Sequence, residues 1–138
     1  MTPAAALQAV LAVLEEDQLA AYMGLVDLLA GLVVECRVDG DAFHVVGGGR
    51  LDVVSGAPLA AQVHVTTSKR AIVALIDGEI TVLQAVKAGQ LDVLADTALL
   101  VRIGRAQRVF ADGAARAARI RPVLAGFRKD RRRRHDSV

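Results

Sequence analysis

The sequence has few aromatic residues and a single cysteine. Phe, Trp and Tyr make up 3% of its 138 residues, and Cys36 is the only cysteine. One cysteine excludes an internal disulfide framework, and the scarcity of aromatics means that the core brings few hydroxyl or indole groups that need hydrogen-bond partners. Hydrophobic residues nevertheless make up 54% of the chain. The interior must therefore consist of Leu, Val, Ile and Ala, which either fill a dense core or line a cavity.

Signals for export and for membrane insertion are also lacking. Met1 is followed by Thr-Pro and an Ala-rich segment without an early Lys or Arg, which does not fit a secretory signal. The most apolar segment, residues 19–34, is shorter than the roughly 20 residues of a membrane span and contains Asp27. We therefore expect a cytoplasmic protein. Cys36 alternates with Val34 and Val38 in a strand pattern, so we expect a buried, unreactive thiol.

The hydrophobic periodicity predicts an α+β protein. Apolar residues recur at helical spacing over residues 4–14 and 18–32, and Glu16 and Asp17 suit the start of the second helix. Alternating patterns predict strands at 33–38, 43–46, 51–54, 62–67 and 91–95. Further helices should begin after Ser68 or Thr67, at Thr81, and after Asp96 or Thr97. These elements predict a five-stranded, mainly antiparallel sheet covered on one face by helices, with an extra N-terminal helical segment. Residues 1–127 would form one domain.

Three features that can indicate catalysis or metal binding have simpler explanations here. Gly47 to Gly49 are followed by a strand pattern and not by a helix start with Lys and Ser or Thr, so we interpret them as a hairpin turn and not as a phosphate loop. The three histidines are too dispersed for a metal site, and no serine lies in a nucleophile elbow. An acid/base cluster of Glu35, Asp52 and His64 is the one arrangement that would support an enzyme. We expect no enzyme activity, cofactor or metal.

The charge is distributed unevenly along the chain. Residues 128–138 include six basic and two acidic residues, whereas the rest of the chain has 11 basic and 13 acidic residues. Such a block is typical of a solvated, disordered tail. It could also bind an anionic membrane surface. No aromatic residue lies between the arginines, so we expect no specific nucleic-acid binding. Pro122 predicts a break in the last helix before Val123, Leu124 and Phe127.

One block of the sequence resembles a known family. The segment LIDGEITVLQAVKAGQLDVLADTALLVRI combines a Leu-x-x-Gly break, an apolar helix, a Gly-x-hydrophobic-x-hydrophobic strand and a Leu-rich helix. Upstream, GGGRLDVVSGAPLAAQVHVTTS gives a strand, a Gly-Ala-Pro turn and another strand. In this order and spacing the segments resemble the sterol carrier protein type 2 family, small lipid-binding domains, over residues 31–110.

The resemblance implies non-catalytic binding of an apolar ligand, such as a lipid, fatty acyl chain or sterol-like molecule, in a cavity between helices and sheet. The family's tunnel-lining positions correspond to Phe43, Ile72, Ile76, Leu83, Val86, Leu99, Leu100 and Ile103, with Phe110 at the mouth. An interaction module with a filled cavity is the alternative, because the apolar residues from 7 to 32 could pair with another chain or form a homodimer. An enzyme acting on a hydrophobic substrate is the third hypothesis.

Overall fold

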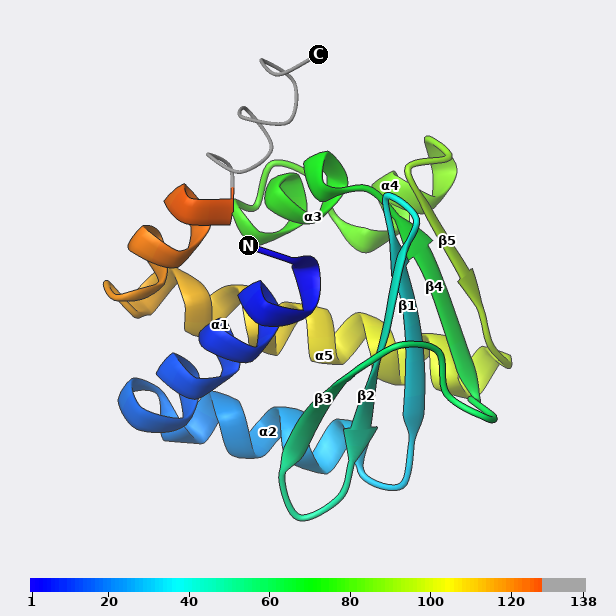
Figure 1. Ribbon diagram of the computed structural model, residues 1–138, viewed down its shortest axis with the longest axis horizontal. Coiled ribbons are helices and arrows are strands. Elements are labelled where there is room, and N and C mark those ends of the chain that lie inside the picture. Colours follow the sequence, from blue (N-terminus) through cyan, green and yellow to red (C-terminus); the bar gives the residue numbers. More distant parts are fainter. Residues whose placement is uncertain (128–138) are drawn as a thin grey trace.

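The computed structural model describes residues 1–127 of the chain, so the basic tail at 128–138 lies outside the described residues. Figure 1 shows a twisted sheet with all the labelled helices on one side of it. The helices are α1 (Pro3–Asp17), α2 (Leu19–Leu29), α3 (Lys69–Ile76), α4 (Val82–Lys87) and α5 (Thr97–Arg116). The strands are β1 (Val33–Val38), β2 (Asp41–Gly47), β3 (Leu51–Ser55), β4 (Val63–Thr67) and β5 (Leu91–Leu94).

The strands form a single five-stranded sheet in the order β3-β2-β1-β4-β5. Three of the pairings are antiparallel, whereas β1 and β4 pair in parallel, with Glu35 opposite His64. The predicted α+β class with a mainly antiparallel sheet is confirmed. The parallel pair arises because the chain leaves β3 and crosses over to place β4 beside β1, a contact that no local pattern specifies.

Two glycines determine how the hairpins of the sheet are built. Asp39 and Gly40 join β1 to β2 with φ angles of 51° and 87°, the geometry of a two-residue hairpin turn with both central residues in the left-handed region. Gly47 ends β2 against the end of α2, where a Cβ atom would lie 1.8 Å from the Leu29 carbonyl oxygen. Because β3 follows directly at Leu51, the glycine triplet belongs to a hairpin and not to a phosphate loop, as predicted.

Side-chain caps start the three helices that follow the fourth strand. Ser68 accepts a hydrogen bond from the Ala71 amide at the start of α3, and Asp96 accepts one from the Leu99 amide at the start of α5. Thr81 and Gln84 form a reciprocal capping box at α4. Each of these starts lies where the sequence predicts it, because a cap and its helix are separated by only a few residues.

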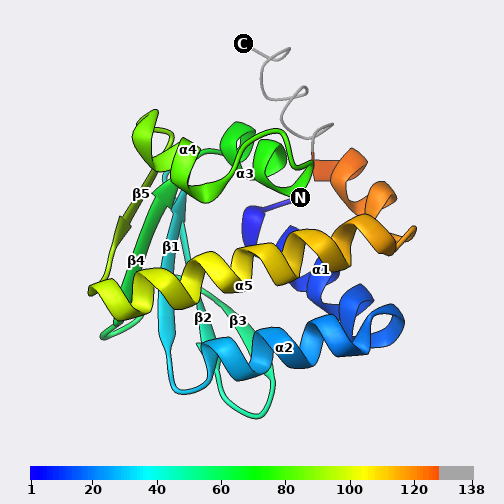
Figure 2. The same cartoon turned by 180° about the vertical axis from the view of Figure 1, so that it is seen from behind.

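α5 runs along the back of the molecule and packs on α2 (Figure 2). Small residues permit this close approach, since a Cβ atom on Gly113 would lie 2.9 Å from the Ala21 Cβ. Arg102 reaches from α5 to the last turn of α2, where its guanidinium donates hydrogen bonds to the carbonyls of Leu28 and Ala30. This contact satisfies carbonyl groups that have no partner within α2.

The chain turns back after α5. Residues 117–119 interrupt the helix, and residues 120–127 are helical again with Pro122 in the first turn, where proline is tolerated. The predicted break is therefore present but lies before Pro122. The sequence suggested that Glu16 and Asp17 start the second helix, but they lie at the end of α1. There they accept hydrogen bonds from Arg119 at 2.7 to 2.8 Å. In the described part of the chain, no helix is long and apolar enough to span a membrane.

Candidate functional site

A pocket of about 290 Å³ lies between the helices and the inner face of the sheet. Its floor is formed by alternate residues of the strands, because the two-residue period directs every second side chain to the same face. β1 contributes Val34, Cys36 and Val38, and β4 contributes Val65 and Thr67. The intervening residues point to the opposite face, so the floor is apolar although the strands themselves are not.

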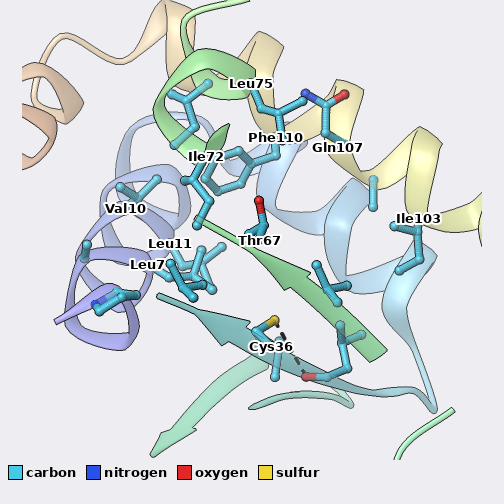
Figure 3. Close-up of a pocket in the computed structure, with 18 of the residues that line it drawn as sticks. Leu7, Val10, Leu11, Cys36, Thr67, Ile72, Leu75, Ile103, Gln107 and Phe110 are labelled. Atoms are coloured by element: carbon cyan, nitrogen blue, oxygen red, sulfur yellow. Dashed lines mark hydrogen bonds between the residues drawn. The ribbon is translucent and has the colours of Figure 1, made fainter. Parts of the chain in front are cut away.

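The walls of the pocket are helical. α1 contributes Leu7, Val10 and Leu11, whose three- and four-residue spacing puts them on one side of the helix. α3 and α5 face them across the pocket, as the labelled side chains in Figure 3 show. The turn after α5 adds Leu124 and Phe127, so the C-terminal end of the described chain also borders the pocket.

The pocket is almost free of polar groups. Among the described residues, none that lines it carries a charge, and the side chains with a polar atom are Cys36, Thr67 and Gln107. The Thr67 hydroxyl donates a hydrogen bond to the Gln90 carbonyl at 2.9 Å. Burial raises the pKa of the Cys36 thiol from 9.0 to about 12, and the charge of Glu35 on the adjacent position adds to the effect. The thiol is therefore protonated and unreactive at neutral pH, as the sequence suggested.

Five of the residues assigned through the family resemblance line this pocket: Phe43, Ile72, Ile76, Ile103 and Phe110. They come from β2, α3 and α5, which the fold brings together although they are far apart in the sequence. Ile103 and Phe110 lie on α5 two turns apart and therefore face the same side. That they contact a ligand remains a prediction.

The other four assigned residues do not line the pocket. Leu83, Val86 and Leu100 are 63%, 43% and 41% exposed, while Leu99 packs against the core outside the pocket. The reason in α4 is its orientation: Ala85 is fully buried against Leu75 and Leu91, which turns Leu83 and Val86 toward solvent. In α5, Leu100 is about 100° further around the helix than Leu99, and it faces solvent whereas Leu99 packs against the core.

The assignment missed the contribution of α1 and the polar residue Gln107. Leu7, Val10 and Leu11 were recognisable as one apolar face, but the sequence does not show that this face lies over the sheet. Gln107 could have been found from its position one turn after Ile103 on the inner side of α5. A polar residue does not belong to the apolar pattern that identifies an inward-facing helix side, so that pattern gives no signal for Gln107.

The candidate acid/base residues Glu35, Asp52 and His64 alternate with inward-facing residues along their strands and lie on the outer face of the sheet, away from the pocket. Glu35 Oε1 is 3.2 Å from His64 Nδ1 and 3.5 Å from Arg37 Nε. The hydrogen bond from His64, helped by the charge of Arg37, lowers the pKa of Glu35. Asp52 does not join this group and instead lies 3.7 Å from Arg50. Over residues 1–127, no cluster of His, Cys, Asp and Glu could hold a metal ion.

No family model and no curated protein matches the chain. Several solved structures, in contrast, are similar to it. A sterol carrier protein domain 2 of Helicoverpa armigera superposes with a TM-score of 0.61 at 18% identity, covering 76% of this chain and 84% of that one. The apo form of sterol carrier protein 2 from Yarrowia lipolytica gives 0.55 at 14% identity, covering 77% and 87%.

A structure described as a UbiJ-SCP2 ubiquinone synthesis protein gives a TM-score of 0.53 at 18% identity and covers 66% of this chain and 76% of that one. At such low identities the similarity concerns the backbone arrangement and not the residues of a site. The resemblance seen in the sequence is confirmed at that level: the chain has the sterol carrier protein 2 fold.

Proposed function

We propose that this protein binds an apolar small molecule in the pocket between its helices and sheet and acts as a non-catalytic carrier or binding protein. The observation that carries the proposal is the pocket itself, an unfilled space of about 290 Å³ with an uncharged, largely aliphatic lining. Small-molecule sites usually measure about 300 to 1,000 Å³ and are lined mainly by hydrophobic side chains. The fold supports the proposal by its similarity to sterol carrier domains.

The lining residues would act mainly by removing the ligand from water. A ligand that buries about 300 Å² of apolar surface gains ~7 kcal/mol from transfer, before the cost of ordering it is subtracted. Aliphatic walls give affinity with little discrimination of shape, so acyl chains, isoprenoid chains and fused rings all fit the chemistry of the lining.

The two other hypotheses have less support in the structure. The apolar face of the N-terminal helices, which motivated an interaction module, is occupied by the protein's own core, where Leu14, Tyr22 and Leu25 are buried. The proposed acid/base cluster is divided between two separate ion pairs on the outer face of the sheet. The ion pairs on the outer face therefore do not reach a molecule in the pocket.

The direct test is to identify what the protein carries. The protein is purified without denaturants, its intact mass is measured under native conditions, and the molecules released on denaturation are identified by mass spectrometry. The proposal predicts one apolar molecule for each chain, or uptake of an apolar fluorophore by empty protein with the same stoichiometry. Empty protein that also takes up no apolar fluorophore would contradict it.

A further inference from the structure

The few polar groups of the pocket differ in their ability to bind a ligand. The Cys36 thiol is a weak donor that lies 4.0 Å from the Val34 carbonyl oxygen. The proton of the Thr67 hydroxyl is already donated to Gln90, which leaves only the oxygen lone pairs for a ligand. The side-chain amide of Gln107 makes no hydrogen bond with another described residue, so both its donor and its acceptor are available.

Gln107 is well placed to meet the polar end of a ligand. It comes from the same wall as Ile103 and Phe110, and Figure 3 shows its side chain beside Phe110 and extending from α5 toward α3. Its side chain is partly exposed, whereas the deeper floor residues Val34 and Val38 are buried. A ligand with its apolar part on the floor would therefore present its polar end to the α5 wall.

The lining disfavours an anionic head group. A carboxylate or phosphate in the pocket would lose its hydration without meeting a cation, since no described lining residue is charged. It would also meet the lone pairs of Thr67, which repel an anion but accept a hydrogen bond from a hydroxyl group. Lys69 is buried and its Nζ lies 4.9 Å from the Phe127 ring centroid, but Lys69 does not line the pocket.

From these observations we infer that the ligand is an uncharged amphiphile, an apolar chain or ring system with a hydroxyl or carbonyl group, and that Gln107 binds this group. The inference rests on the proposed function and adds the chemical class of the ligand and the residue that selects it. The amide of Gln107 donates to a carbonyl or hydroxyl oxygen, and its oxygen accepts from a hydroxyl. An uncharged group therefore binds without an uncompensated buried charge.

The test compares ligands that share a chain and differ in the head group. 1-Decanol, decanoate and methyl decanoate are titrated at pH 8 against an apolar fluorophore bound to the full-length protein. We expect the alcohol and the ester to displace the fluorophore at concentrations at least ten-fold lower than decanoate does. Gln107→Met keeps the length of the side chain and removes the amide. It should weaken the binding of 1-decanol about five- to ten-fold, which corresponds to the loss of roughly one hydrogen bond.

Two further variants make the result decisive. Thr67→Val removes the second polar group. It should weaken the binding of 1-decanol but not that of methyl decanoate, because only the alcohol can donate a hydrogen bond to Thr67. Lys69→Met tests the opposite hypothesis, in which the buried cation attracts an anion. Tighter binding of decanoate that is lost in Lys69→Met, or an unchanged alcohol preference in Gln107→Met, would overturn the inference while leaving the proposed function intact. If the fluorophore itself did not bind, the proposed function would fail.

Discussion

On the inner face of the sheet, β1 and β4 present Val34, Cys36 and Val65 to the pocket, whereas on the outer face the same two strands present Glu35, Arg37 and His64. Neighbouring residues along one strand therefore belong to different chemical environments. The inner face is suited to excluding water, and the outer face carries ion pairs in contact with solvent. The titratable residues that suggested catalysis in the sequence are thus separated from the pocket by the sheet itself.

The largest expected difference between the faces concerns buried charge. Val63 is fully buried on the inner face, and Thr66 is exposed on the outer face of the same strand. Val63→Asp should lower the free energy of unfolding by more than about 3 kcal/mol, because the carboxylate would be buried without a partner. Thr66→Asp should change it by less than about 0.5 kcal/mol. Urea denaturation of both variants measures the difference, and equal losses would contradict the assignment of the faces.

The next prediction concerns the contact between the inner face and α2. Because a Cβ atom at Gly47 would overlap the Leu29 carbonyl, Gly47→Ala requires the end of α2 to move. We expect it to lower the free energy of unfolding by about 2 kcal/mol or more. Gly49→Ala is the matched control, since no atom lies within 4 Å of its Cβ position. Thermal denaturation that ranks the two variants as equal would show that the two elements are not in contact.

The buried thiol gives the inner face a signature at alkaline pH. Because the pKa of Cys36 is about 12 in the folded protein and 9.0 ordinarily, the unfolded chain loses the proton first as the pH rises. The stability should therefore fall between pH 9 and 12, by roughly 1 kcal/mol per pH unit. Cys36→Ala removes this contribution, so wild type and variant should diverge above pH 9 in urea denaturation. Parallel stability curves would indicate a hydrated thiol.

The smallest expected effect lies on the outer face. The pKa of Glu35 is lowered by its hydrogen bond with His64, so this carboxylate stabilises the fold above its ordinary pKa of 4.5 and loses the contribution as the pH falls through the lower, folded value. Glu35→Gln should remove that acid dependence and leave ligand affinity unchanged. Denaturation at several pH values from 2 to 6, with a binding titration at pH 7, checks both statements. A loss of binding would place Glu35 in the site.

The sequence predicts local features of this fold well. Ser68, Thr81 and Asp96 are close in sequence to the amides that they cap, and alternation along each strand indicates which residues share a face. The parallel pairing of β1 with β4 and the position of α1 over the pocket depend on contacts between distant segments. No periodicity within one segment contains that information.

Only part of the pocket lining could be predicted, because the rest depends on how distant segments pack together. Ile103 and Phe110 are on the inward-facing side of α5 and line the pocket, whereas Leu83 lies outside it because the burial of Ala85 sets the orientation of α4. A hydrophobic residue in a six-residue helix can face either way, and only its packing partners decide. Leu100 shows the same effect at the start of α5.

The most direct test of the account compares Ile103→Arg with Leu100→Arg. Ile103 lines the pocket, whereas Leu100, three residues earlier on the same helix, is 41% exposed outside it. The two variants add the same charge, and circular dichroism with thermal denaturation establishes that both are folded. Titration with an apolar fluorophore should show at least 100-fold weaker binding for Ile103→Arg and a change of less than about two-fold for Leu100→Arg. Equal affinities in the two variants would contradict the claim that this pocket binds the ligand.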